Sequence, residues 1–376
     1  MRTMKIGIDV RPLSRPPAGI HRAVRNVLLH LQEIDSENTY YLYCDREFDL
    51  AIQNSRWRRR IGRRVSFLPG SLWLQTDAKR MAVEDGVDVF WGTTHALPFA
   101  LPSSTRGILT INDLVWPEYS RTMSFYNRVV NCLCFRKSIR RAHVVVVPSQ
   151  STRLGMENGF AVPPSQVRTI PYGVENHFQP VRPAVAAARI ARTYGVSEDY
   201  LCAVGTIEPR KNLATLIEAV RILRNRQQCE AQLLIAGAKG WKSAPLYRRL
   251  ADSGFTENDV KFLGYVPEED MPYLYAGASV FVFPSLYEGF GFPALEAMAC
   301  GAPVVASNAS SIPEVVGEAA LLFDPHRPAE LAEAILRVRS DSALREHLIS
   351  SGISRAAQFK WVDTARATLA VLTGSD

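Results

Sequence analysis

Residues 283–305, FPSLYEGFGFPALEAMACGAPVV, constrain the fold more than any other stretch of this chain. An apolar run at 278–283 indicates a buried strand, and a loop with two glycines follows it. A helix is then expected from about Pro293, because proline suits the first helical turn, where its missing N–H costs nothing. The stretch therefore predicts a strand, a loop and a helix in direct succession.

The loop of this unit has the chemistry of a ligand site. Gly289 and Gly291 let backbone N–H groups approach a ligand at the helix N-terminus, which favours anions. Glu288 lies in the loop and Glu296 in the first turns of the helix. Amide donors and two separate carboxylates suit a ligand that is anionic and rich in hydroxyls, such as a nucleotide sugar. Alternatively, such glycine loops are common, and a Glu in the first turn can simply complement the helix dipole.

The rest of the chain alternates between apolar strands and amphipathic helices. Strands are expected at 5–10, 40–44, 87–91, 107–110 and 143–148, and again at 200–204, 232–236, 261–263, 280–283 and 304–306, with helices at 20–31 and 213–224 among them. This alternation is typical of parallel sheets with helices on both faces. One glycine and two prolines interrupt the periodicity at 172–183, so we expect two doubly wound halves that bind ligands at the carboxyl ends of their strands.

Composition narrows the class of protein. The 376 residues suffice for two domains, and 47% hydrophobic and 22% charged residues are typical of a globular protein. No apolar run reaches the roughly 18 to 20 residues of a membrane helix, and the first residues lack a signal-peptide core. The six cysteines, at 44, 132, 134, 202, 229 and 300, are sparse and without zinc spacing, which favours a reduced cytoplasm.

Positive charge is concentrated in the first half. Residues 1–180 hold 24 Lys and Arg against 15 Asp and Glu, whereas the remainder holds 20 against 22. An anionic partner or surface facing the first half is the inference. Basic residues gather at 57–64 (WRRRIGRR) and 125–141. A solvated helix face would explain them; the alternative is docking on an anionic membrane leaflet, where each basic residue adds about 1 kcal/mol. Nucleic acid is not expected, because no nucleic-acid module is present.

A second candidate site lies at 205–212, GTIEPRKN. Arg210 and Lys211 precede a predicted helix with Asn212 as its N-cap, and two cations beside a helix N-terminus favour a diphosphate. The alternative is a solvated basic pair. The sequence has no Asp-x-Asp and no His/Asp cluster with metal spacing, so no divalent metal is expected. A glycosidase is not favoured either, because eight helical residues would separate Glu288 and Glu296 by about 12 Å, more than the roughly 5 to 9.5 Å between glycosidase carboxyls.

The string EGFGFPALE, followed by MACGAPVVAS, resembles the signature of the family 4 retaining glycosyltransferases. The resemblance covers nearly the whole chain: 160–180 is similar to the family's interdomain passage, 205–212 to its donor loop and 262–271 (FLGYVPEEDM) to its nucleotide-facing strand end. It implies an α/β fold of GT-B type, with two Rossmann-like doubly wound domains facing across a cleft. The implied parts are an acceptor-binding domain (1–175), a linker (176–183), a nucleotide-sugar-binding domain (184–358) and a C-terminal helix (359–376) that packs back on the first domain.

The resemblance also implies the reaction. A sugar would pass with retention from a nucleotide-diphosphate sugar to a hydroxyl of a glycan, or of a lipid-diphosphate-linked glycan, in polysaccharide biosynthesis. GDP-mannose is the favoured donor, with UDP- and dTDP-sugars left open. Attack would occur on the front face, with the leaving phosphate accepting the proton. We expect no cofactor and no divalent metal, and a location in the cytoplasm with peripheral contact to the cytoplasmic membrane face.

Site residues follow from the matching positions. The resemblance gives catalytic roles to Glu288, Arg210, Lys211 and Asp113, with Glu288 on the hydroxyls of the transferred sugar and Glu296 on the ribose. The cations would contact the diphosphate and stabilise it as a leaving group. The full set of expected donor contacts is Gly19, Thr206, Arg210, Lys211, Tyr265, Glu288, Gly289, Phe290, Gly291, Phe292 and Glu296.

The chain departs from the family pattern in its first half. Asn112 stands where members often have histidine, and His21 lies in a loop that is often Gly-x-Gly-Arg. Asn can hydrogen-bond a sugar hydroxyl but cannot act as an acid or base. We expect His21, Asn112 and Asp113 to contact the acceptor. The alternative for Asp113 is helix capping, and the alternative for His21 is that it hinders a close approach of the backbone to phosphate. Asn112 also leaves open a second hypothesis, a catalytically silent homologue that binds nucleotide or glycan as a partner subunit.

Overall fold

A computed structural model describes residues 3–16, 18–62, 70–114 and 134–375. The chain divides into two compact units, Met1–Gly173 with Lys360–Asp376, and Val174–Phe359. The first boundary lies two residues before the one expected from the sequence. Gly173 ends the first passage through unit 1, and a Cβ atom there would lie 2.3 Å from the backbone nitrogen of Trp361, where the chain re-enters that unit. Glycine is therefore required where the two passages meet.

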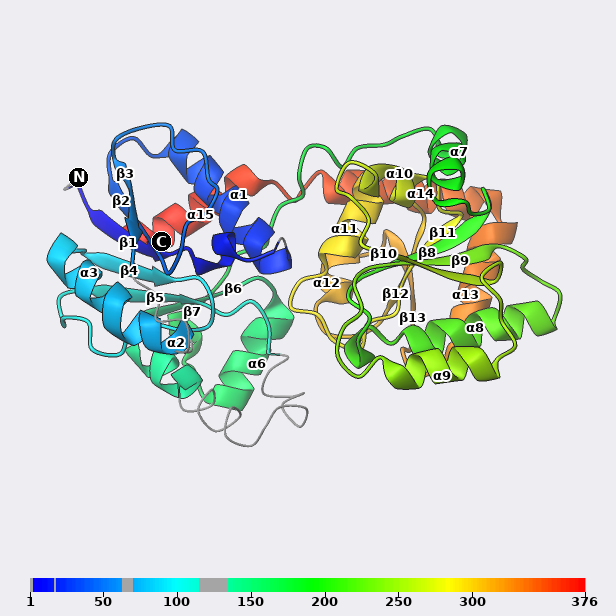
Figure 1. The fold of residues 1–376 in the computed structure, drawn as a ribbon, viewed down its shortest axis with the longest axis horizontal. Coiled ribbons are helices and arrows are strands. Elements are labelled where there is room, and N and C mark those ends of the chain that lie inside the picture. Colours follow the sequence, from blue (N-terminus) through cyan, green and yellow to red (C-terminus); the bar gives the residue numbers. More distant parts are fainter. Residues whose placement is uncertain (1–2, 17, 63–69, 115–133, 376) are drawn as a thin grey trace. The chain divides into compact units, whose positions relative to one another are not determined.

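The first unit is built on a seven-stranded parallel sheet in the order β3-β2-β1-β4-β5-β6-β7. Its strands are β1 (Lys5–Asp9), β2 (Thr39–Cys44), β3 (Trp57–Ile61), β4 (Val89–Gly92), β5 (Arg106–Thr110), β6 (Val144–Val147) and β7 (Val167–Thr169). Helices α1 (Gly19–Ile34) and α15 (Trp361–Thr373) cover one face, and α2 (Gly70–Trp73) and α3 (Lys79–Asp85) cover the other (Figure 1). The unit also contains η1 (Arg11–Ser14), η2 (Leu74–Ala78), α6 (Gln150–Phe160) and η4 (Pro164–Gln166).

Burial explains why these segments form this unit. The four valines of β6 are buried, as expected for a strand covered on both faces. The buried apolar residues of α1, Val24, Val27, Leu28 and Leu31, recur with helical spacing. Helix α15 packs against α1, although more than 300 residues separate them in the sequence. The C-terminal segment therefore completes the hydrophobic layer of the first unit.

The basic stretch 57–64 is partly an edge strand and not a solvated helix, which corrects one sequence interpretation. Among the described strands, β3 pairs with β2 alone and is therefore an edge strand. Its successive arginine side chains point to opposite faces of the sheet. The guanidinium groups of Arg58 and Arg59 lie over the rings of Tyr41 and Phe48, and Arg60 Nε lies 2.9 Å from Asp85 Oδ2. Residues 63–64 and 125–133 lie outside the described residues. Within the described ranges, no helix is both long and apolar enough to cross a bilayer.

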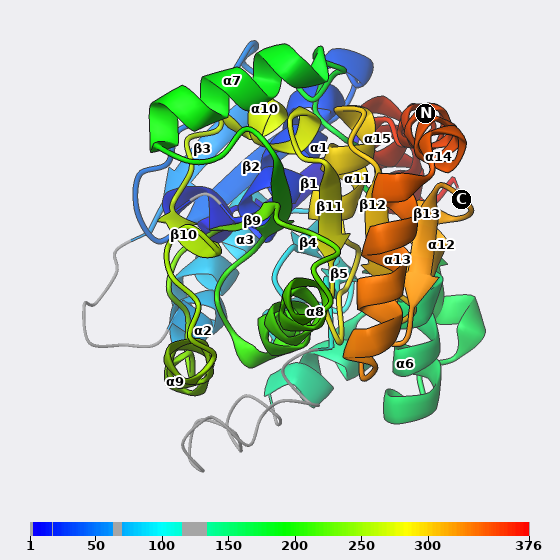
Figure 2. The same cartoon turned by 90° about the vertical axis from the view of Figure 1, so that its right-hand side faces the viewer.

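The second unit contains a six-stranded parallel sheet in the order β10-β9-β8-β11-β12-β13. Its strands are β8 (Tyr200–Val204), β9 (Gln232–Ala236), β10 (Val260–Gly264), β11 (Val280–Phe283), β12 (Val304–Ser307) and β13 (Ala320–Phe323). Helices α8 (Leu213–Asn225), α9 (Ala244–Asp252) and α13 (Pro328–Ser340) lie on one face, with α8 beside α13 (Figure 2). Helices α10 (Met271–Ala276), α11 (Phe292–Ala299) and α14 (Ser342–Ala356) lie on the other. The remaining elements are α7 (Pro183–Tyr194), η5 (Pro209–Lys211) and α12 (Ile312–Val316).

Strand order fixes where each unit can bind a ligand. In the first sheet the order reverses between β1 and β4, and in the second between β8 and β11. Loops that leave adjacent parallel strands diverge at such a point, so a crevice opens beyond the carboxyl ends of the strands. The loops after β8 and β11 are the two stretches that the sequence singled out for donor binding.

Candidate functional site

The loops after β8 and β11 meet through buried ion pairs. Lys211 Nζ lies 2.6 Å from Glu288 Oε1, and Arg210 Nη1 lies 2.7 Å from Glu288 Oε2. Arg210 Nη1 also donates to the carbonyl of Tyr287, at 2.8 Å. The structure thus brings together three residues that the sequence assigned to catalysis, although their positions in the chain are 77 and 78 residues apart.

The charge state of this cluster follows from its surroundings. Glu288 is only 8% exposed. Burial by itself would raise the pKa of its carboxyl, but the charges of Lys211 and Arg210 and a hydrogen bond from Lys211 hold that pKa below its ordinary value. Glu288 is therefore a carboxylate at neutral pH. It can accept hydrogen bonds from hydroxyl groups but cannot donate a proton.

Arg210 is held by a second carboxylate. Its Nη2 lies 2.7 Å from Glu208 Oε1, and the other oxygen of Glu208 accepts from Trp241 Nε1 at 2.8 Å. Two basic side chains therefore face two acidic ones. This balance preorganises the cations, because their positions are fixed before any anionic ligand arrives.

Two serines hold the glycine loop before α11 through hydrogen bonds to its backbone. Ser310 Oγ accepts from the backbone N–H of Glu288, and Ser311 Oγ donates to the carbonyls of Glu288 and Phe290. Gly291 precedes the helix with φ of 121°, a conformation that side chains rarely adopt. These contacts fix the loop that connects the carboxyl end of β11 to the N-terminus of α11. The backbone N–H groups at that N-terminus favour an anion. Ser310 and Ser311 were not among the residues expected from the sequence.

Glu296 has partners different from those of Glu288. It is 2% exposed, and its Oε2 accepts from the hydroxyl of buried Tyr275 at 2.7 Å. The two glutamates therefore have distinct environments, one between cations and the other against a phenol. Binding of the ribose by Glu296 stays a prediction.

The other expected donor contacts lie in the same unit, except Gly19, and Phe292 among them is the first residue of α11. Thr206 is exposed just after β8, and Tyr265 is 72% exposed just after β10. Asn212 precedes α8 but makes no side-chain cap; its Nδ2 instead donates to the carbonyls of Pro284 and Pro325. Asn212 therefore ties the loop after β8 to two neighbouring loops. Gly19 is the first residue of α1 in the other unit.

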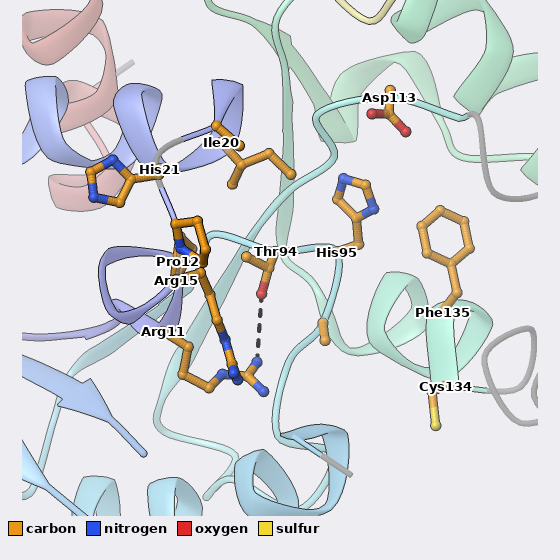
Figure 3. Close-up of a pocket in the computed structure, with 13 residues that line it drawn as sticks. Arg11, Pro12, Arg15, Ile20, His21, Thr94, His95, Asp113, Cys134 and Phe135 are labelled. Carbon is orange, nitrogen blue, oxygen red and sulfur yellow. Dashed lines mark hydrogen bonds between the residues drawn. The ribbon is translucent and has the colours of Figure 1, made fainter. Parts of the chain in front are cut away.

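The first unit has its own pocket, with a volume of about 510 Å³, beyond the carboxyl ends of β1, β4 and β5. His21, His95, Asp113, Arg11 and Arg15 contribute polar groups to its wall (Figure 3). Arg11 is paired with buried Asp9 at 2.6 Å and donates to Thr94 Oγ1 at 3.5 Å. His21 and Asp113, both expected near the acceptor, thus line one cavity.

The side chain of Asn112 has partners inside the protein, and its expected contact with the acceptor stays a prediction. It is 8% exposed, its Nδ2 donates to the carbonyl of Thr93 at 3.0 Å, and its Oδ1 accepts from the hydroxyl of Tyr172. Both ends of its amide are used inside the protein, so the side chain is not directed at the pocket. His95 also lines the pocket, although it took no part in the sequence hypothesis.

Comparison with known proteins identifies the family. The sequence profile described as Glycosyl transferases group 1 matches residues 192–355. O-antigen chain mannosyltransferase B of Escherichia coli is 32% identical over 283 residues, which span 75% of this chain and 73% of that protein. The chain belongs to the group 1 glycosyltransferases. Serotype-specific mannosyltransferase WbdA of Escherichia coli is 34% identical over 173 residues, 46% of this chain and 21% of that protein.

Solved structures agree with this assignment at the level of the fold. Anabaena Alr3699/HepE, solved in complex with UDP and glucose, superposes with a TM-score of 0.74 at 20% identity, over 99% of this chain and 100% of that one. Sucrose-phosphate synthase from Thermosynechococcus elongatus gives 0.77 at 21% identity, over 98% of each chain. The expected GT-B fold, with two Rossmann-like domains, is thereby confirmed, and this group 1 glycosyltransferase is an enzyme of glycosyl transfer.

Among the described residues of this glycosyltransferase, no group of three or more His, Cys, Asp or Glu side chains could hold a metal ion. Positive charge beside the candidate donor site comes instead from Arg210, Lys211 and the N-terminus of α11.

Proposed function

We propose that this glycosyltransferase transfers mannose from GDP-mannose, with retention, to a hydroxyl of a glycan or lipid-linked glycan in polysaccharide biosynthesis. The mannosyltransferases among its relatives support the choice of sugar and pathway. The observation that carries the proposal is the buried contact of Glu288 with Lys211 and Arg210 beside the N-terminus of α11. This contact brings together a carboxylate that can accept hydrogen bonds from sugar hydroxyls and two cations that can bind a diphosphate.

In this proposal the residues of the second unit bind different parts of the donor. Arg210 and Lys211 bind the diphosphate and stabilise the charge that develops on it as the bond from the anomeric carbon to the phosphate oxygen breaks. Glu288 accepts hydrogen bonds from hydroxyls of the transferred sugar. Glu296 holds the ribose, and Tyr265 provides a further contact to the donor. No divalent metal is needed in this scheme, because the protein supplies the cations.

Retention follows if the acceptor oxygen attacks from the face that the diphosphate leaves. The new bond forms between that oxygen and the anomeric carbon, and the acceptor proton passes to the departing phosphate oxygen. The pocket of the first unit supplies the acceptor side of this proposal, with Asp113 and His21 as contacts. Glu288 cannot supply a proton, since its pKa is lowered.

The experiment is a turnover assay with purified protein. GDP-mannose, UDP-glucose and dTDP-rhamnose are each supplied with mannose-terminated oligosaccharides and with a lipid-diphosphate-linked glycan. Transfer from GDP-mannose with α product, shown by the one-bond C1–H1 coupling in NMR, is the expected result. A different preferred donor would overturn the choice of GDP-mannose, and a β-mannoside formed from GDP-mannose would overturn retention.

The alternative is a homologue that binds nucleotide or glycan without turnover. Asn112 is the residue that favours it, and the amide of Asn112 is hydrogen-bonded to Thr93 and Tyr172. Nucleotide binding by calorimetry, with no transfer from any donor, would establish this alternative.

Membrane contact is the remaining part of the proposal. Arg58 and Arg59 are exposed on the edge strand β3. They belong to the first half of the sequence, which is rich in basic residues. Vesicles of phosphatidylcholine with and without phosphatidylglycerol test it by co-sedimentation. Binding that requires the anionic lipid and weakens with salt is expected; equal binding to both vesicles, or none, would contradict it.

A further inference from the structure

His95 lies in a strained backbone conformation on the wall of the first-unit pocket. Its φ is 60°, in the left-handed region that residues other than glycine seldom adopt. Such strain persists only where neighbouring groups fix the residue, and it is concentrated at functional sites. The loop after β4 therefore presents this side chain at a cost to backbone stability.

Two hydrogen bonds hold His95 in place. Its backbone N–H donates to the carbonyl of Thr110, at 3.1 Å, and its ring Nε2 accepts from the backbone N–H of Asn112, at 2.9 Å. Both partners lie at the end of β5. The imidazole is thereby fixed against the neighbouring strand. Its ring also lies edge-on to that of Phe135, with the ring centroids 6.3 Å apart, and both residues line the pocket.

These contacts determine the tautomer. Because a backbone N–H can only donate, Nε2 must carry the lone pair, and neutral imidazole then has its hydrogen on Nδ1. Burial lowers the pKa of His95, partly offset by the nearby charge of Asp113, which favours the neutral form. Within residues 3–16, 18–62, 70–114 and 134–375, no hydrogen-bond partner of Nδ1 is found. The side chain is partly exposed, and it lines the pocket.

We propose that His95 is a sugar-positioning residue, whose Nδ1–H donates to a hydroxyl oxygen of the acceptor while Asp113 accepts the hydrogen of a hydroxyl on the same sugar. Figure 3 shows the imidazole and the carboxylate of Asp113 on the same side of the pocket, with Phe135 beside them. A hydrogen-bond donor and an acceptor on the same side of the pocket suit two hydroxyls of one sugar. The inference rests on the proposed function in taking the acceptor to be a glycan.

This assignment also limits what His95 can do. Because Nδ1 already carries a hydrogen and Nε2 is occupied, the imidazole cannot take the proton of the attacking hydroxyl. His95 therefore orients the acceptor and is not a general base. The competing explanation is purely structural, with the ring serving only to hold the backbone of Asn112.

Two substitutions separate these explanations. In His95→Asn, the amide nitrogen stands one bond beyond Cγ, as Nδ1 does, so the donor is kept; Asn also tolerates a positive φ. In His95→Gln, the amide oxygen reaches about as far as Nε2 and can accept from Asn112, but the donor near Nδ1 is lost. A ligand role predicts that Asn is the better replacement, and a structural role predicts that Gln is.

The kinetic test measures KM for the acceptor, with the preferred donor saturating. His95→Gln should raise that KM about five- to tenfold, the effect of one lost hydrogen bond, while His95→Asn should stay within about threefold of the wild type. KM for the donor should change little in either. The reverse order, an equal loss in both variants, or no loss in either would overturn the proposal.

A binding test on the wild type needs neither turnover nor a stable variant. Protein with ¹⁵N-labelled histidine is titrated with methyl glycosides of mannose, glucose, galactose and rhamnose, and the Nδ1–H resonance of His95 is followed by NMR. A shift of that resonance on saturation with at least one glycoside supports the proposal, even if the enzyme transfers no sugar under the conditions used. No shift with any of the four would overturn it. Failure of the proposed function is seen separately, as absence of transfer by the wild type.

Discussion

Lys211 Nζ lies 2.6 Å from Oε1 of Glu288, while Arg210 Nη1 holds the other oxygen of the same carboxylate. The side chains of all three residues are between 10% and 15% exposed. One buried carboxylate therefore links the loops after β8 and β11 and competes with any bound diphosphate for the two cations. The strength of the proposed donor site depends on this competition.

The first prediction concerns the cations. Changing Arg210 or Lys211 to Ala should lower kcat by an amount equivalent to on the order of 2 to 4 kcal/mol in the barrier, because each contacts developing phosphate charge in the proposed mechanism. Steady-state kinetics with the preferred donor measures this. Near-normal rates in both variants would remove the diphosphate role.

A matched control is available on α8. Arg221 pairs with Glu218 at 2.5 Å on the helix that follows the donor loop, and both side chains are partly exposed. Arg221→Ala removes the same charge from the same unit without touching the cluster. Its kcat should equal that of the wild type, and a comparable loss would mean that net charge, not contact, matters.

A second prediction concerns metal. Activity should persist in excess EDTA, because Arg210, Lys211 and the N-terminus of α11 supply the positive charge. Initial rates before and after chelation provide the measurement. Complete loss with EDTA, restored by Mg²⁺ or Mn²⁺, would show that the metal arrives with the donor or uses ligands outside those named.

A third prediction concerns acid stability. The pKa of Glu288 in the folded protein lies below 4.5, its ordinary value. A carboxyl with a lowered folded pKa contributes stability that is fully present above the unfolded pKa and lost as pH falls through the folded one. The wild type should therefore lose more free energy of unfolding below about pH 4.5 than Glu288→Gln, which cannot titrate. Urea unfolding between pH 3 and 6 tests this, and parallel curves would contradict it.

Much of the fold could be predicted from the sequence because strands buried on both faces are continuous apolar runs. Val280–Phe283 and Tyr200–Val204 have the bounds expected from their sequences. Strand β3 was missed because its arginines give it the composition of a solvated surface. A strand at a sheet edge needs little apolar character, and the rings of Tyr41 and Phe48 accommodate its guanidinium groups.

Only part of the candidate site could be predicted from the sequence. Charged residues beside glycines are visible in a sequence, so Glu288, Arg210 and Lys211 could be named before their contacts were known. Their mutual pairing depends on the adjacency of β8 and β11, which no local pattern encodes. His95 was missed because a lone histidine carries no motif; its positive φ and its bond to Asn112 exist only in the folded chain.

A further prediction compares the stability of the two glutamate variants. Size alone would predict that Glu288→Gln and Glu296→Gln fold equally well. The structure predicts otherwise, because Glu288→Gln leaves Lys211 and Arg210 buried beside a neutral amide. Removing one partner of a buried ion pair costs on the order of 3 kcal/mol. In Glu296→Gln, the amide oxygen can still accept from Tyr275, so the change should be under about 1 kcal/mol. Melting curves of both variants measure this difference.

The same pair should also differ in kinetics once the folded fraction is known. Glu296, if it holds the ribose, contacts a part of the donor that hardly changes during reaction, so Glu296→Gln should mainly raise KM and weaken binding of free GDP. Glu288, if it holds the transferred sugar, contacts the ring whose charge changes in the transition state, so Glu288→Gln should mainly lower kcat. Calorimetry with GDP should then find nearly normal affinity in Glu288→Gln. If Glu288→Gln instead lost GDP affinity while Glu296→Gln lost only kcat, the two roles would have to be exchanged.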